Sequence, residues 1–201
     1  MGNQFDKTFE HDQALLDAAL NEFVDKGYDK ASLNNILKEA NMSKGSFYYH
    51  FKNKEDLYFN LIDILIEKKK VFLAKTMKPE DFTKDIFTIF KTQIRLGMEF
   101  SCQYPDINRF SESFIKEKGN EIYKKAMKKH DFQSNDQINQ LVKVAYVRGD
   151  FREDLPLGFV QNLIGYLFTH VVEMTDMSQS DNYEDGMNYL VDFMKNGLAK
   201  K

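Results

Sequence analysis

Apolar residues recur at intervals of three and four along almost the whole chain, and no segment shows the sustained alternation of a half-buried strand. This spacing predicts an all-α protein with about nine helices. The expected helices cover residues 12–26, 33–40, 44–51, 54–77, 80–103, 106–118, part of 120–148, 157–177 and 183–199. The pattern indicates a break around residues 131–136 in the seventh of these regions but does not define where it begins and ends.

Two of the expected helices are short and follow each other closely. Ser32 and Ser43 stand where an N-capping hydroxyl is expected, directly before each short helix. Gly27 follows the first long helix as a C′ residue, and Asn41 is one of the few non-glycine residues that tolerate a left-handed turn. Two short helices joined by a tight turn indicate a helix-turn-helix motif, whose second helix lies in the major groove of DNA.

The second short helix separates apolar from polar positions. Phe47 and Phe51 share one face, which we expect to lie in the core. A polar face is left for a partner, and it or its edges carry Lys44, Ser46, Tyr48, Tyr49 and His50. Gly45 would let the backbone approach DNA closely, although a glycine tolerated at the start of a helix is an equal alternative. For the two tyrosines the alternative is ordinary packing.

This segment closely resembles the TetR family of transcriptional regulators. The resemblance rests on residues 27–33, on Ile36 and Ala40, and on residues 43–57, and it extends over about residues 14–61. Asn41 stands where many members have glycine. The resemblance implies a helix-turn-helix DNA-binding domain over residues 7–58 and a helical ligand-binding and dimerisation domain over residues 59–201.

The resemblance also implies which residues contact DNA. Those facing the duplex from the second short helix and its cap would be Ser43, Lys44, Gly45, Tyr48, Tyr49 and His50, and we also expect Ser46, on the polar face of that helix, to contact DNA. Lys54 would reach a phosphate from the start of the next helix, and Ser32 could do the same. By their chemistry, hydroxyls and helix N-termini suit phosphate contacts, whereas Lys44 and His50 could read base edges.

Aromatic residues and methionines are frequent in the rest of the chain, with 28 Phe and Tyr and nine Met in total. The resemblance implies a ligand pocket in this part. The residues expected to line it are Phe90, Ile94, Met98, Phe110, Phe114, Tyr123, Tyr146 and His170. For any single aromatic residue, ordinary core packing is the alternative.

The helix expected over residues 157–177 is apolar around most of its circumference, so it must be covered on two sides. We expect it to pair, together with the last helix, with the same helices of a second copy in a four-helix interface. The residues expected there are Val160, Ile164, Leu167, Val171, Met187, Val191 and Met194.

Charge is distributed unevenly along the chain. The formal net charge is −3 and the pI about 5.9, which argues against a protein that coats nucleic acid through a uniformly basic surface. Residues 38–54 nevertheless hold four Lys and one Glu, a net +3, whereas residues 1–37 hold three Lys and seven acidic residues, a net −4. A basic tip on an acidic body would orient the protein on DNA, although such a cluster is by default only a solvated surface.

Signals for other classes of protein are weak. The four histidines have no zinc or di-iron spacing, and no phosphate-binding loop or nucleophile elbow occurs, so we expect no catalytic residues, metal or cofactor. The only cysteine, Cys102, is interpreted as a buried apolar residue. No membrane span, signal peptide or lipidation motif is evident, which favours a cytoplasmic protein.

The expected function is therefore that of a ligand-responsive transcriptional regulator that binds a palindromic operator as a homodimer, and the resemblance favours a repressor over an activator. A small apolar or aromatic effector would release it from double-stranded DNA. Two alternatives stay open at this point. One is a helical enzyme or small-molecule carrier with a vestigial helix-turn-helix, and the other is a protein-interaction adaptor anchored by Tyr48 and Tyr49.

Overall fold

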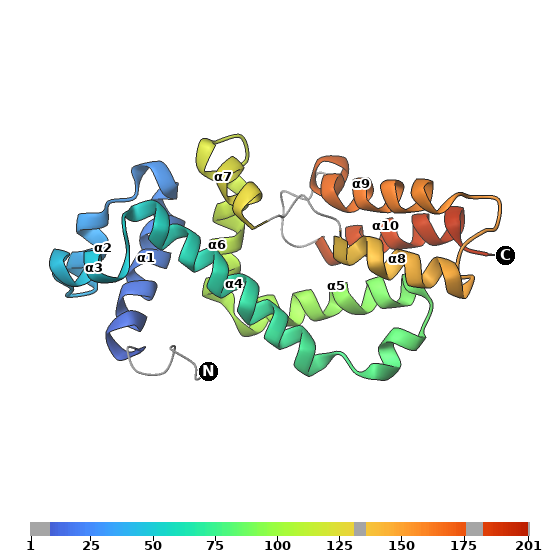
Figure 1. The fold of residues 1–201 in the computed structure, drawn as a ribbon, viewed down its shortest axis with the longest axis horizontal. Coiled ribbons are helices and arrows are strands. Elements are labelled where there is room, and N and C mark those ends of the chain that lie inside the picture. The colour runs from blue at the N-terminus through green and yellow to red at the C-terminus, as the bar shows by residue number, and fades with distance from the viewer. Residues whose placement is uncertain (1–8, 131–135, 176–182, 201) are drawn as a thin grey trace. The chain divides into compact units, whose positions relative to one another are not determined.

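The computed structural model describes residues 9–130, 136–175 and 183–200, and these residues fold into helices joined by short connections (Figure 1). The predicted all-α class is confirmed. The elements are α1 (Phe9–Lys30), α2 (Leu33–Glu39), α3 (Lys44–His50), α4 (Lys54–Thr76), the 3₁₀ helix η1 (Pro79–Thr83), α5 (Ile86–Gln103), α6 (Pro105–Lys116), α7 (Glu121–Lys129), α8 (Asp136–Arg148), α9 (Leu157–Thr175) and α10 (Tyr183–Leu198).

Ten α-helices are described rather than about nine. The seventh expected region contains two of them, α7 and α8, and the break predicted around residues 131–136 falls mainly on a segment outside the described residues. The helix expected from residue 80 is also divided, because Asp85 ends the connection after η1 and caps α5 by accepting the amides of Phe87 and Thr88, both at 3.1 Å. The end predicted at residue 177 lies outside the described residues.

The chain divides into two compact units, residues 1–71 with 103–131, and residues 72–102 with 132–201. The first unit therefore contains α6 and α7 in addition to the helix-turn-helix segment. The division between these units does not coincide with the boundary expected near residue 58. No helix within the described ranges is long and apolar enough to cross a membrane.

The first unit is built around a cluster of aromatic rings. The ring of Tyr58 lies 4.8 Å from that of Phe23, 5.0 Å from that of Tyr28 and 5.4 Å from that of Phe110, measured between centroids and all in edge arrangements. Burial raises the pKa of the Tyr58 hydroxyl far above its usual range, with the Glu117 charge adding to the effect. Because these residues come from α1, α4 and α6, the cluster holds the helix-turn-helix against α6.

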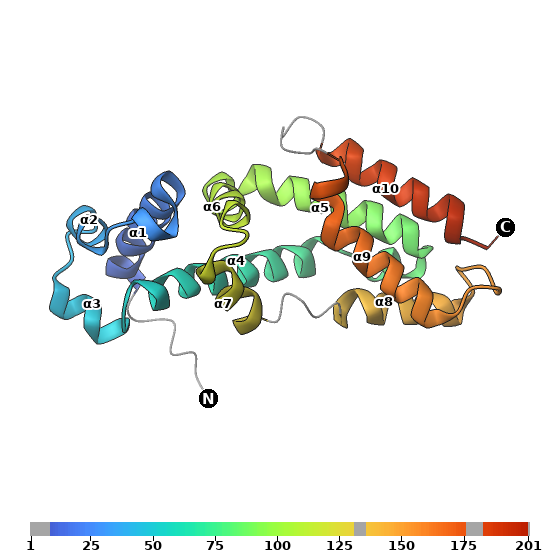
Figure 2. The ribbon, with the colours of Figure 1, turned by 90° about the horizontal axis from the view of Figure 1, so that it is seen from above.

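The second unit buries the residues that the sequence placed at a dimer interface. Figure 2 shows α9 between α8 and α10, and α9 packs against both of these helices. The seven predicted residues are all below 10% exposed and belong to one core: Val160, Ile164, Leu167, Val171, Met187, Val191 and Met194. The structure thus corrects their assignment, because side chains packed inside one chain present no surface to a second copy.

Candidate nucleic-acid interface

The helix-turn-helix forms as its local signals predict. The Ser32 hydroxyl accepts the amide of Asn35 at 3.5 Å, and the Ser43 hydroxyl accepts the amide of Ser46 at 3.1 Å, so each serine caps its helix. Asn41 has φ 49° in the connecting turn. The short turn and the two capped helix ends together fix the orientation of α3 relative to α2.

One face of α3 is buried and the rest is exposed. Phe47 is fully buried, and its ring stacks on that of Phe51 with centroids 5.5 Å apart. Tyr48 and Tyr49 are 57% and 85% exposed. The other predicted DNA-contacting residues of this helix and its cap are exposed as well, namely Ser43, Lys44, Gly45, Ser46 and His50. Ser32 is partly buried because it lies in the corner between α1 and α2.

The exposed aromatic residues of α3 make ring contacts with their neighbours in the same helix. The rings of Tyr49 and His50 meet edge to face, with centroids 4.9 Å apart, and the Tyr48 ring meets that of Phe47 at 5.2 Å. Tyr49, at 85% exposure, adds little to the stability of the unit through burial. Its phenol and hydroxyl are free to contact a phosphate or a base.

No close contact within the described chain requires glycine at position 45 of α3. A methyl group at Gly45 would meet only the Ser43 hydroxyl, at 3.8 Å, which is an ordinary contact. Alanine would fit and would favour the helix by about 1 kcal/mol. The unit itself therefore does not need glycine there, whereas a partner lying against the backbone would.

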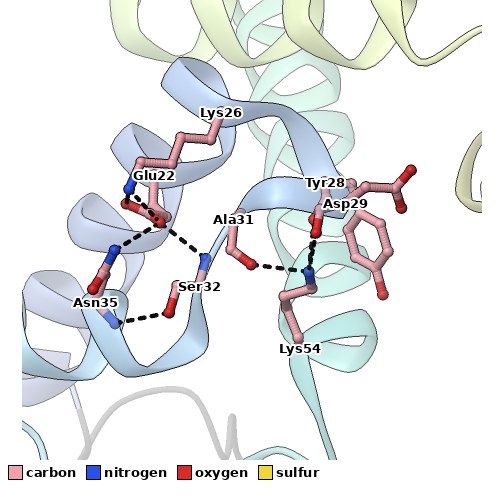
Figure 3. Close-up of polar contacts among 8 residues, drawn as sticks. All are labelled: Glu22, Lys26, Tyr28, Asp29, Ala31, Ser32, Asn35 and Lys54. Carbon is pink, nitrogen blue, oxygen red and sulfur yellow. Dashed lines mark hydrogen bonds and ion pairs between the residues drawn. The ribbon is translucent and has the colours of Figure 1, made fainter.

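The corner between α1 and α2 is held by Glu22 (Figure 3). Its carboxylate accepts the Ser32 amide at 2.9 Å, the side-chain amide of Asn35 at 3.3 Å and the ammonium group of Lys26 at 2.9 Å. Burial would raise the pKa of Glu22, but these hydrogen bonds and the Lys26 charge lower it below its usual value. The corner is thus fixed by an ionised carboxylate at the working pH.

Lys54 has a different role from the predicted phosphate contact. Its ammonium group donates to the carbonyl oxygens of Tyr28 at 2.7 Å, Ala31 at 2.9 Å and Asp29 at 3.3 Å (Figure 3). It also lies 4.5 Å from the centroid of the Tyr28 ring. Three N–H donors satisfied in this way leave none for DNA, so we correct the assignment: Lys54 joins the start of α4 to the end of α1.

Glu117 is a site residue that the sequence did not indicate. This residue caps the end of α6, is 7% exposed and accepts the Tyr28 amide at 2.7 Å. Its second oxygen accepts the side-chain amide of Asn120. The Tyr28 contact joins residues 89 positions apart, so no local pattern could have revealed it.

The predicted ligand-binding residues are distributed over both units. Phe110, Phe114 and Tyr123 belong to the first unit, where the last two stack with centroids 4.9 Å apart. The second unit holds the other five, namely Phe90, Ile94, Met98, Tyr146 and His170. Two of these are engaged internally, because the Tyr146 hydroxyl donates to the Leu155 carbonyl at 2.7 Å and the His170 ring stacks on Tyr166 at 4.0 Å.

Two further expectations concern the cysteine and a possible metal site. Cys102 is exposed, which corrects its interpretation as a buried residue. It lies in the last turn of α5, on the side of that helix away from the buried Phe100. Across the part of the chain that the structure describes, no three His, Cys, Asp or Glu side chains are grouped so that they could hold a metal ion.

Comparison with known proteins points to one family. Residues 15–61 match the tetR family of bacterial regulatory proteins. The biofilm operon icaADBC negative transcriptional regulator IcaR of Staphylococcus epidermidis is 28% identical over 125 residues, which are 58% of this chain and 68% of that protein.

Two solved structures share the fold over nearly their whole length. The SmeT–triclosan complex has a TM-score of 0.72 at 17% identity and covers 95% of this chain and 92% of its own. The regulator FadR of Bacillus subtilis, in complex with stearoyl-CoA, has a TM-score of 0.65 at 17% identity, with 92% and 98% covered. The motif, the helix order and these relatives all indicate a transcriptional regulator of the TetR family, and residues 15–61 are the part of the chain that the family's model matches.

Proposed function

We propose that this regulator is a repressor that binds a palindromic operator as a homodimer and is released by a small apolar or aromatic effector. The observation that carries the DNA-binding part is the exposed face of α3. Its residues are held in place by caps and by the buried Phe47, yet they contribute little to the core. Such a face fits the major groove, which is about 12 Å wide and accepts one helix.

The contacts sort by chemistry. Lys44 stands in the first turn of α3, where side chains of a recognition helix reach base edges. Tyr49 and the hydroxyls of Ser43 and Ser46 suit phosphate oxygens. Exposed lysines near both ends of the motif, Lys38 and Lys52, add positive charge that attracts the duplex without reading its sequence.

Dimerisation would use the outer face of the helices whose inner face is buried. Phe159 and Tyr166 on α9 are 51% and 58% exposed, and Tyr189 and Phe193 on α10 are 72% and 68% exposed. Four large aromatic residues on two adjacent helices form the kind of apolar surface that a second copy covers. Two recognition helices could then read half-sites about 34 Å apart.

Repression and effector release are supported by the relatives. IcaR is a negative regulator, and SmeT and FadR were solved with triclosan, an aromatic compound, and with stearoyl-CoA, which carries a long apolar acyl chain. The aromatic residues of the second unit offer a similar chemistry in this chain. An effector that favours a dimer with more widely separated recognition helices by a coupling of about 1–3 kcal/mol would lower operator affinity roughly 5- to 150-fold.

The test of DNA binding is selection from a pool of random duplexes by the purified protein at a stated salt concentration. We expect a palindrome to be enriched, and Lys44→Ala to lose affinity and sequence preference together. Tyr49→Phe separates a hydroxyl–phosphate contact from packing of the ring. Lys128→Ala, an exposed lysine on α7, is the matched control and should bind normally. Failure of the wild type to enrich any sequence over a range of salt concentrations would refute the proposal.

The dimer is tested by sedimentation equilibrium over a range of protein concentrations. Phe193→Asp should shift the equilibrium towards monomer, because a carboxylate in an apolar interface is costly to desolvate. Val147→Asp on α8, at 80% exposure, is the control for adding one exposed carboxylate. If both variants sediment as the wild type does, the interface lies elsewhere.

A further inference from the structure

The turn that leads from α1 into the helix-turn-helix is held by two charged residues that lie outside α2 and α3. Gly27 has φ 70° and ψ 169°, so the helical conformation of α1 is interrupted there. The chain then continues through Tyr28 to α2. The direction in which α2 and α3 leave α1 depends on how this turn is fixed.

The two backbone polar groups of Tyr28 are bound by side chains of opposite charge. The Glu117 carboxylate accepts its N–H at 2.7 Å, and the Lys54 ammonium group donates to its carbonyl oxygen at 2.7 Å. The first comes from the end of α6 and the second from the start of α4. Hydrogen bonds to charged groups are about twice as strong as neutral ones, so both hold the peptide units firmly.

The glycine and the carboxylate fit one another. A Cβ atom at Gly27 would lie 2.9 Å from Oε1 of Glu117, closer than real Cβ contacts permit. The absence of a side chain therefore lets the carboxylate reach the Tyr28 amide. The backbone of Gly27 has a conformation that only glycine adopts readily, and the hydrogen bond from the Tyr28 N–H to the buried Glu117 carboxylate stabilises it.

We propose that Glu117 is a positioning residue for DNA binding, which sets the orientation of the recognition helix through the Tyr28 amide. This inference rests on the proposed function. A recognition helix must be placed within about 0.5 Å to contact base edges productively, and the turn at Gly27 connects it, through α2, to α1. Loss of the carboxylate frees that turn while the aromatic core around Tyr58 still holds the helices together.

The experiment compares three variants of the full chain. Glu117→Ala removes the acceptor, and Glu117→Gln keeps one carbonyl oxygen that can accept the amide. Ser113→Ala is the matched control, because the Ser113 hydroxyl also joins α6 to α1, donating to the Phe23 carbonyl at 3.2 Å, but does not touch the turn. Affinity for the selected duplex is measured at a temperature where circular dichroism shows every variant folded. Hydrogen exchange is measured on a peptide that covers residues 28–40.

We expect Glu117→Ala to lower affinity at least roughly 10-fold and to speed exchange in the peptide, with Glu117→Gln restoring both to within about 3-fold of the wild type. Ser113→Ala should lower the melting temperature but leave affinity and exchange unchanged. The inference is overturned if Glu117→Ala binds and exchanges like the wild type, or if Ser113→Ala has the same effects. If the wild type selects no duplex, the proposed function fails, and the exchange data alone decide whether Glu117 fixes the turn.

Discussion

Replacing Lys54 by methionine distinguishes a lysine that supports the fold from one that contacts DNA. Methionine keeps an apolar chain of similar length and removes only the ammonium group. In the structure that group donates to three carbonyl oxygens, two of them within 3.0 Å, and lies against the Tyr28 ring. The variant leaves these oxygens without their charged donor.

The magnitude follows from these contacts. A hydrogen bond to a charged group contributes about 1.5–3 kcal/mol, but bonds that share one donor group are not additive. Partial exposure of Lys54 lets water replace part of the loss. We therefore expect the free energy of unfolding to fall by about 2–3 kcal/mol, which lowers the melting temperature of a chain of this size by roughly 4–12 °C.

The assay is thermal unfolding of the free protein, followed by circular dichroism, beside Lys52→Met as control. Lys52 is two residues away and exposed, so its variant should change stability by less than about 0.5 kcal/mol. A phosphate contact predicts the reverse for Lys54→Met: an unchanged melting temperature, weaker DNA binding and a salt dependence reduced by about one charge. Equal melting temperatures for the two variants would refute the structural role.

Two further predictions concern stability. Gly27→Ala should destabilise by at least about 1–3 kcal/mol, because the residue has φ 70° and a methyl group would meet Glu117. Gly97→Ala is the control, because nothing lies within 4 Å of the added methyl group, and it should be neutral or stabilise by about 0.5–1 kcal/mol in the same thermal assay. A similar loss of stability in the Gly27 and Gly97 variants would contradict this explanation. Burial raises the pKa of Asp85, but hydrogen bonds from the Thr88 hydroxyl and nearby amides outweigh it and lower the pKa below its usual value. The Asp85 carboxylate therefore stabilises the fold above its unfolded pKa of about 4, and this stabilisation is lost as the pH falls through the lower pKa of the folded state. We expect the urea midpoints of the wild type and Asp85→Asn to differ most above about pH 5 and to converge only below about pH 4. A constant difference across this range would exclude the carboxylate as its source.

The parts of the fold that could be predicted from the sequence are those that depend on neighbouring residues. Ser32 and Ser43 cap helices through bonds spanning three residues, and the conformation of Asn41 is a property of one residue. Phe47 is buried because a short helix with one apolar side can bury only that side. Local physics therefore determines the helix-turn-helix and the exposed face of α3.

The rest depends on contacts between distant segments. The helix α9 is apolar on two sides, and its own sequence does not determine which side faces α8 and α10 and which faces outward. The structure buries Val160 and Ile164 and exposes Phe159 and Tyr166, the reverse of the predicted dimer surface. A period of 3.6 residues identifies the faces of a helix, but only the packing of its neighbours assigns them.

Lys54 shows why the position of a residue in a motif does not determine where its side chain points. A lysine at the start of α4 can extend towards a duplex or back towards the end of α1. The N-terminus of α4 carries partial positive charge, and the carbonyl groups that end α1 carry partial negative charge. The ammonium group is therefore repelled by its own helix and attracted by the carbonyls of Tyr28 and Ala31, 26 and 23 residues earlier. Electrostatics within the chain thus favours the contact with α1, and a phosphate would have to offer more than three hydrogen bonds already made.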